Sequence, residues 1–184
     1  MGKALLETSE ILFRGEFRLK IPFVEIKAAK AVKGELRVRF AEGEAVFELG
    51  AASEKWADKI LHPKSVIEKI GVKPGGKAVV LGVKDADFLK RLHALAECSE
   101  KIGRGSELIF FGAESAAQLK RVRALANSLA PEGALWIVYP KGRKEITEVG
   151  VISAGRGAGL KDVKVVGFSA THTALKFVIP VADR

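Results

Sequence analysis

Cysteine, tyrosine and tryptophan are scarce in this chain of 184 residues, which has one cysteine, one tyrosine and two tryptophans. With Cys98 alone, no disulfide can form within the chain and a cysteine-based metal cluster is excluded. The histidines, His62, His93 and His172, fall on different predicted elements without the spacing of metal ligands, so we expect no metal site. Low thiol content suits the reducing cytosol, and we expect a cytoplasmic protein.

Long hydrophobic runs are also absent. The longest, such as 108–113 and 134–139, have the length of a strand, whereas a membrane helix needs roughly 20 apolar residues. We therefore expect no membrane-spanning segment. The first residues lack the apolar core and the small-residue cleavage site of a signal peptide, so we expect no export.

The strong catalytic signatures are missing as well. The chain contains no P-loop, no His-Glu-x-x-His, no Gly-x-Ser-x-Gly and no Cys-x-x-Cys. No reaction class follows from a motif, and we expect a binding function rather than a catalytic one.

The net charge of +9 is unevenly distributed. Residues 1–61 hold 11 Lys/Arg and 10 Asp/Glu, and residues 62–184 hold the other 20 and 12. A basic second part suits an anionic partner such as a phosphate-bearing small molecule, although dispersed lysines also keep a protein soluble. Because stacking aromatics are few, we expect no sequence-specific binding to nucleic acid.

Apolar and polar residues alternate with period two from residue 10 to residue 50, which predicts half-buried strands. The alternating segments are 11–13, 17–21, 36–40 and 45–49, and glycine-containing turns lie at 14–16, 33–35 and 42–44. Short turns join antiparallel neighbours, so the pattern predicts a β-meander. Residues 25–32 supply a further strand or a helix, since their alanine-rich centre suits either.

A helix is predicted after the meander. Ser53 is a candidate N-cap, and Trp56, Ile60 and Leu61 form an apolar face that covers the meander. His62-Pro63 ends the helix, because the residue before a proline resists the α conformation. The sequence therefore predicts an antiparallel β module with a covering helix at 1–62, followed by a second domain at 63–184.

Strands and helices alternate in the second domain. The predicted strands span 77–83, 107–113, 135–139, 163–168 and 174–181, and the predicted helices span 86–97, 115–129 and 146–157. Such alternation predicts an α/β fold, a Rossmann-like and mostly parallel sheet covered by helices on both faces, with a closing antiparallel hairpin.

Three segments of this domain resemble class I S-adenosylmethionine methyltransferases. Residues 70–82, with the sequence IGVKPGGKAVVLG, resemble the entry to the first strand of that family. Residues 129–135 resemble the turn before its fifth strand, and residues 163–181 resemble its closing antiparallel pair. The resemblance implies a degenerate methyltransferase-like Rossmann fold.

The cofactor site of that family differs from this sequence. The family has a Gly-x-Gly-like turn after the first strand and an acidic residue after the second strand that holds ribose hydroxyls. Here a single glycine, Gly82, is followed by Val83-Lys84, and the second and third strands are compressed into the interval between Ala96 and Glu107, which leaves little room for an adenosine pocket. We therefore expect no cofactor, S-adenosylmethionine included.

The sequence also resembles a bacterial family of unknown function, domain of unknown function 3052. The similar segments are 70–75, 132–136, 140–141 and 175–178. The resemblance covers residues 65–180 and implies a bacterial protein with this fold, without implying an activity.

Ligands of open parallel sheets bind outside the carboxyl ends of the strands. Three cations follow the strand that ends at Tyr139, and the turn between the last two strands returns to the same edge of the sheet. We predict an anion site there, in which the cations clamp the ligand, the hydroxyl groups orient it and the histidine transfers a proton. Its residues are Lys141, Arg143, Lys144, Ser169, Thr171, His172 and Thr173. A solvated loop balanced by Glu145 and Glu148 is the alternative.

Three functions remain open from the sequence. The main hypothesis is non-catalytic binding of an anionic small molecule at the carboxyl edge of the sheet. One alternative is a methyltransferase-like enzyme with an atypical cofactor site. The other is a scaffold whose β module recruits a protein partner through an exposed edge strand.

Overall fold

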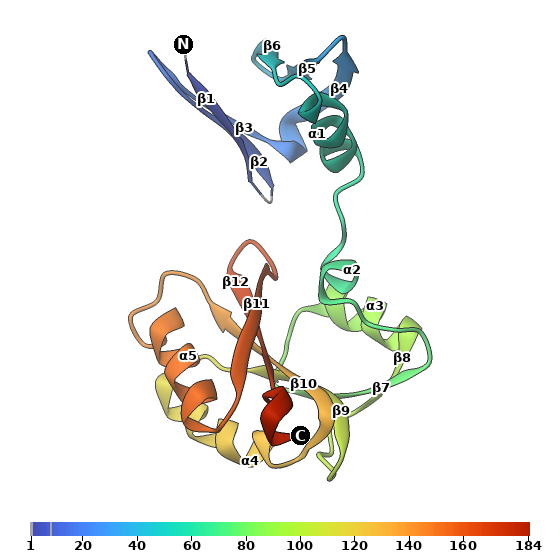
Figure 1. Cartoon of the computed structure of the whole chain (residues 1–184), viewed down its shortest axis with the longest axis vertical. Helices are drawn as coiled ribbons and strands as arrows, with labels where there is room; N and C mark the ends of the chain where they lie inside the picture. Colours follow the sequence, from blue (N-terminus) through green and yellow to red (C-terminus); the bar gives the residue numbers. More distant parts are fainter. Residues whose placement is uncertain (1, 8) are drawn as a thin grey trace. The chain divides into compact units, whose positions relative to one another are not determined.

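A computed structural model gives the structure of the chain and describes residues 2–7 and 9–184. The chain divides into two compact units, Met1–Ser65 and Val66–Arg184 (Figure 1). The division falls at Ser65, at the end of a segment without helix or strand that begins at the predicted boundary of His62-Pro63. No helix in the described part of the chain is long and apolar enough to cross a membrane.

The first unit contains two antiparallel sheets of three strands each. One sheet consists of β1 (Lys3–Leu6), β2 (Glu10–Arg14) and β3 (Arg18–Pro22), and the other of β4 (Ile26–Val32), β5 (Glu35–Phe40) and β6 (Gly43–Glu48). The predicted antiparallel meander is present, but it is split between the two sheets. A 3-10 turn, η1 (Phe23–Glu25), separates them after Pro22, which has no N–H to continue the ladder.

The hairpin between β4 and β5 shows why residues 26–32 form a strand rather than a helix. Val32 pairs directly with Glu35, so the turn contains only Lys33 and Gly34. Both have positive φ values, 50° and 86°, which is the type I′ geometry that matches the twist of paired strands. The tight turn pairs β4 directly with β5, so the backbone groups of residues 26–32 bond across the hairpin, and the turn fixes the register.

Both sheets of the first unit share one apolar core with α1 (Ala52–Leu61). The helix buries Ser53, Ala57 and Ile60, which recur at helical spacing on one face. The predicted apolar face is therefore wrong at Leu61, whose side chain is 51% exposed, while Trp56 packs partly buried against the core.

The predicted cap of α1 is also wrong. Ser53 lies inside the helix, and its hydroxyl donates to the carbonyl oxygen of Gly50 at 2.9 Å. Ala51 occupies the N-cap position, with no side-chain hydrogen bond. The serine hydroxyl is satisfied by bonding back one turn, which is the local alternative open to serine within a helix.

The second unit is built on a six-stranded sheet with the order β11-β12-β10-β9-β7-β8. The strands are β7 (Gly76–Leu81), β8 (Ala96–Ser99), β9 (Ser106–Gly112), β10 (Leu129–Pro140), β11 (Lys161–Gly167) and β12 (His172–Val178). All pairs from β8 to β10 are parallel, and β12 pairs antiparallel with both β10 and β11. The predicted α/β class, with a mostly parallel sheet and a closing antiparallel hairpin, is confirmed.

Helices cover both faces of this sheet (Figure 1). On one face, α2 (Val66–Ile70) and α3 (Ala86–Leu95) pack against a core centred on Phe110 and Trp136. On the other face lie η2 (Ala116–Arg121), α4 (Val122–Ala126) and α5 (Glu148–Gly157). A last 3-10 turn, η3, spans Val181–Asp183.

Two predicted helices are shorter than expected. The helix predicted at 115–129 begins with a capping box between Ser115 and Gln118, continues as the 3-10 helix η2 and then α4, and ends at Ala126, because Leu129 already belongs to β10. The helix predicted at 86–97 ends at Leu95, and β8 follows without a loop. In both places pairing with a neighbouring strand overrides helical propensity.

Candidate functional site

The carboxyl ends of β7, β8, β9 and β10 meet at one edge of the sheet, because these strands are parallel. The chain leaves β7 toward α3 on one face and leaves β9 toward η2 on the other. The switch point of the fold therefore lies between β7 and β9, which is where open α/β sheets bind ligands. Two cavities lie at this edge.

The first cavity, here called the crevice, has a volume of about 320 Å³. It lies at the carboxyl ends of β7 and β8, between α3 and Arg121 of η2. Its lining residues are Val80, Leu81, Gly82, Val83, Leu89, His93, Cys98, Ser99, Glu100 and Arg121. The volume falls within the range of roughly 300–1,000 Å³ that is usual for small-molecule sites.

Glu100 is the residue of the crevice that the sequence prediction missed. It follows the last residue of β8, is exposed, and lies 18 positions after Gly82. In dinucleotide-binding folds an acidic residue about 20 positions after the glycine turn binds the ribose hydroxyls. The second strand of the unit, β8, occupies only four residues at the edge of the sheet, so Glu100 directly follows it.

Gly82 has a positive φ of 71° at the end of β7. A Cβ atom there would lie 3.2 Å from the carbonyl oxygen of Gly112, and a Cβ atom on Gly112 would overlap the carbonyl of Gly82. Two glycines therefore let the ends of β7 and β9 approach each other closely. The chain lacks a second glycine in the turn, and the backbone of Gly82 is held by this contact between strands.

The second cavity has a volume of about 280 Å³ and shares Gly82 and Val83 with the crevice. Its lining residues are Gly82, Val83, Lys84, Asp85, Gly112, Glu114, Val138, Phe168, Ser169, Thr171 and His172. Asp85 is the N-cap of α3, and its carboxylate accepts from the backbone N–H of Phe88 at 2.9 Å. The N-terminus of α3 is therefore already occupied by a carboxylate.

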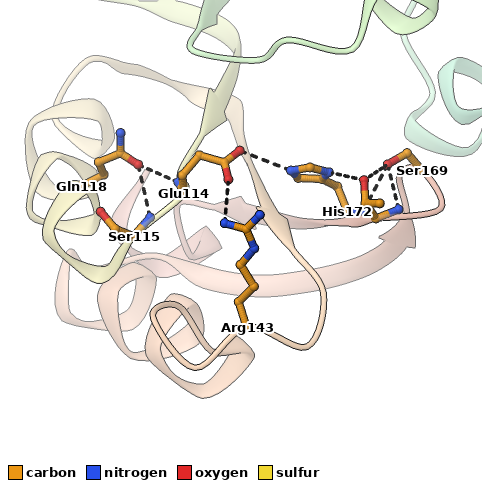
Figure 2. A network of polar contacts seen from close by, with 7 residues as sticks. Glu114, Ser115, Gln118, Arg143, Ser169 and His172 are labelled. Carbon is orange, nitrogen blue, oxygen red and sulfur yellow. Dashed lines mark hydrogen bonds and ion pairs between the residues drawn. The ribbon is translucent and has the colours of Figure 1, made fainter.

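A polar network crosses the second cavity (Figure 2). Glu114 Oε1 lies 3.2 Å from His172 Nε2, and the other ring nitrogen, Nδ1, lies 2.8 Å from Thr171 Oγ1. Arg143 Nη1 lies 4.0 Å from Glu114 Oε2. The backbone N–H of Glu114 donates to Gln118 Oε1 at 2.5 Å, so the capping box of η2 positions this glutamate.

The structure brings the two predicted anion-binding loops side by side. The backbone N–H of Lys141 donates to the carbonyl oxygen of Thr171 at 2.8 Å, and Lys141 Nζ donates to that of Ser169 at 2.7 Å. The hydroxyl of Ser169 accepts from the backbone N–H groups of Thr171 and His172, at 3.3 and 3.1 Å. Lys141 and Ser169 thus stabilise the turn itself.

The remaining predicted site residues are more dispersed. Lys144 is exposed, and Thr173 lies within β12 opposite Tyr139. Four of the predicted site residues line neither cavity: Lys141, Arg143, Lys144 and Thr173. Glu114, which contacts both Arg143 and His172, is an acidic residue that the sequence prediction left out of the site.

Two further titratable groups lie near this edge. Burial raises the pKa of the Cys98 thiol in the crevice, so it stays protonated at neutral pH. The hydroxyl of Tyr139 donates to Glu148 Oε2 at 3.0 Å, and burial, with this hydrogen bond second, raises the pKa of Tyr139. Within residues 2–7 and 9–184, no group of three His, Cys, Asp or Glu side chains is placed to hold a metal ion.

The fold and the crevice define an α/β protein with a Rossmann-like second unit. No family model matches the sequence, and no curated protein matches it significantly. The resemblance to domain of unknown function 3052 therefore gains no support.

Several solved structures are similar to this chain, and most of those with the highest similarity are described as methyltransferases. A SAM dependent methyltransferase from Aquifex aeolicus has 16% identity and a TM-score of 0.44, over 62% of this chain and 88% of that one. A TehB-like SAM-dependent methyltransferase from Corynebacterium glutamicum has 10% identity and a TM-score of 0.41, over 69% and 95%. At these TM-scores the likenesses carry no argument about ligand or reaction.

Proposed function

We propose that the second unit binds a nucleoside-bearing small molecule in the crevice, and that S-adenosylmethionine is the first such ligand to test. One observation carries the proposal: Gly82 and Glu100, which follow two neighbouring parallel strands, line the same crevice beside the switch point of the sheet.

The crevice offers a different kind of contact to each part of such a ligand. The carboxylate of Glu100 accepts hydrogen bonds from the vicinal hydroxyls of ribose. Val80 and Leu89 provide apolar surface for a base. The guanidinium of Arg121, which lies 5.3 Å from the centroid of the Phe111 ring, suits an anionic end of the ligand.

This proposal replaces the expectation that the chain binds no cofactor. That expectation rested on a single glycine after the first strand and on a compressed second strand. Gly82 alone adopts the positive φ of the turn, and β8 ends at Ser99 with an acidic residue directly after it. Of the features whose absence led to that expectation, only the second glycine of the turn is still missing.

Isothermal calorimetry with S-adenosylmethionine, adenosine and 2′-deoxyadenosine tests the proposal. We expect Glu100→Gln to weaken binding by about tenfold or more, since hydrogen bonds to charged groups contribute about 1.5–3 kcal/mol. Glu97→Gln is the matched control, because Glu97 is exposed on the same strand but does not line the crevice. Absence of binding by the parent, or equal affinity of the Glu100→Gln variant, would refute the proposal.

The anion site predicted from the sequence is a second candidate. The observation that favours it is the contact between the two loops, through Lys141 and Thr171. Glu114 opposes it, because its carboxylate lies between Arg143 and His172 and already offsets the charge of Arg143. An anion there must compete with this carboxylate.

A further inference from the structure

We propose that the Thr171 hydroxyl is a nucleophile that accepts small acyl groups from activated esters in the second cavity. In this proposal His172 is its base and Glu114 is the positioning residue. The activity is separate from nucleoside binding in the crevice and does not depend on it.

The hydrogen-bonding roles of the histidine follow from its two partners. The carboxylate of Glu114 only accepts, so His172 Nε2, at 3.2 Å, carries a proton and donates to it. In the neutral ring Nδ1 is then the acceptor, and the Thr171 hydroxyl, at 2.8 Å, donates to it. A hydroxyl whose proton points at an imidazole nitrogen is poised to lose that proton when its oxygen attacks.

The protonated ring keeps both contacts. When Nδ1 takes up a proton it donates to Thr171 Oγ1, while Nε2 still donates to the carboxylate of Glu114. No side chain has to rotate for the proton to move in either direction. A nucleophile, its base and a carboxylate that orients the base are recognised by these roles, and not by their order in the chain.

The surrounding structure holds the three groups in place. The turn that carries Thr171 is fixed by the hydroxyl of Ser169 and by the backbone of Lys141. Glu114 is held at the start of η2 through Gln118. His172 begins β12, and its side chain is 29% exposed, so the ring is partly shielded from water.

The cavity sets the class of substrate. Its volume of about 280 Å³ suits a small ester, and Val83 and Phe168 provide apolar walls for an acyl chain. The backbone N–H groups of Thr171 and His172 are used by Ser169, so they are not available to an oxyanion. Lys84, which lines the cavity, supplies the positive charge for the oxygen that becomes negative during attack.

The reaction proceeds in two balanced steps. Thr171 Oγ1 forms a bond to the acyl carbon while its proton passes to His172 Nδ1. The bond from that carbon to the leaving oxygen then breaks, and the leaving oxygen keeps the electron pair. The leaving oxygen finally takes the proton from His172 Nδ1. Water next attacks the acyl carbon, gives a proton to Nδ1 and releases the carboxylic acid. The Thr171 oxygen takes that proton back and is regenerated.

The experiment uses p-nitrophenyl acetate with the full chain. We expect release of p-nitrophenol and one acetyl group on Thr171 that hydroxylamine removes, as it does from esters but not from lysine amides. Thr171→Val should abolish this label and Thr171→Ser should retain it. Thr173→Val is the matched control. Thr173 lies within β12 and does not line the second cavity, so this variant should be acetylated on Thr171 as the parent is.

The roles of the other two residues have separate readouts. His172→Gln should slow acylation by about 100-fold, the lower range for loss of a general base, and should remove its rise with pH. Glu114→Gln should slow it, and Glu114→Asp should recover part of the rate, which a structural role alone would not produce. Thermal unfolding of each variant confirms that it is folded.

Two results would overturn the proposal. One is acetylation confined to lysines, found by peptide mapping of the parent. The other is labelling of Thr171 at the parent rate in the folded His172→Gln variant. The acylation assay contains no nucleoside, so failure of nucleoside binding and failure of this proposal are distinguishable.

Discussion

Gly155 and Gly157 lie two positions apart in α5, and replacing each with alanine should change stability in opposite directions. Gly155 is buried, and a Cβ atom there would overlap the ring of Phe177, which is 0% exposed on β12. Gly157 is exposed, and a Cβ atom there would meet no atom within 4 Å. The pair therefore separates the cost of overpacking from helix propensity.

The two effects differ enough in size to decide the sign. Glycine to alanine within a helix gains about 0.5–1 kcal/mol. Forcing an extra methyl group into a packed core costs about 1–3 kcal/mol. The Gly155→Ala variant should thus lose roughly 1–2 kcal/mol of unfolding free energy, while Gly157→Ala, at the end of the helix, should gain up to about 0.5 kcal/mol.

Urea unfolding followed by tryptophan fluorescence measures both changes. Trp56 lies in the first unit and Trp136 is fully buried in the second, so a Trp56→Phe background leaves a reporter for the second unit alone. A Gly155→Ala variant that is as stable as Gly157→Ala would refute the packing of α5 on β12. Adding Phe177→Leu should relieve the overlap and reveal a coupling energy between positions 155 and 177.

Two further predictions concern the carboxyl edge. Tyr139 is the only tyrosine, so ultraviolet titration should show that it ionises well above the ordinary value of about 10, and Glu148→Gln should reduce the difference. Because the pKa of Tyr139 is raised on folding, its contribution to stability is complete below that ordinary value and is lost as the pH rises above it. Calorimetry with inorganic phosphate tests the anion site: Arg143→Ala should weaken binding by about tenfold or more, and Glu114→Gln should strengthen it, with Lys144→Ala as the comparison. A parent that binds no phosphate, or an Arg143→Ala variant that binds it equally well, would exclude that site.

The architecture of the second unit was predictable from hydrophobic pattern. The continuous apolar runs within β7 and β9 indicate strands buried on both faces, and both strands lie inside the sheet. The four-residue strand β8 follows α3 directly, so no turn residue marks its start. Glu100 was missed because its position directly after a strand is visible only once β8 is recognised.

The polar network was beyond sequence reasoning for a different reason. Glu114 and His172 are 58 positions apart, and no local pattern links a residue after β9 with the start of β12. Their contact depends on the order of the sheet, in which β10 separates these two strands. The contact between the loops of Lys141 and Thr171 was predictable. The closing antiparallel strand β12 pairs with β10, so the turn before β12 lies beside the end of β10.

The two cavities share Gly82 and Val83, and the close approach of Gly82 to Gly112 fixes that segment against the neighbouring strand. A molecule that shifts this backbone from one side changes the shape of the other cavity. By thermodynamic linkage, any such effect is mutual: the factor by which the first occupant alters the affinity of the second equals the factor by which the second alters that of the first. The affinity of one ligand, measured in the presence of the other, therefore reports how rigidly the contact between Gly82 and Gly112 holds the backbone between the two cavities.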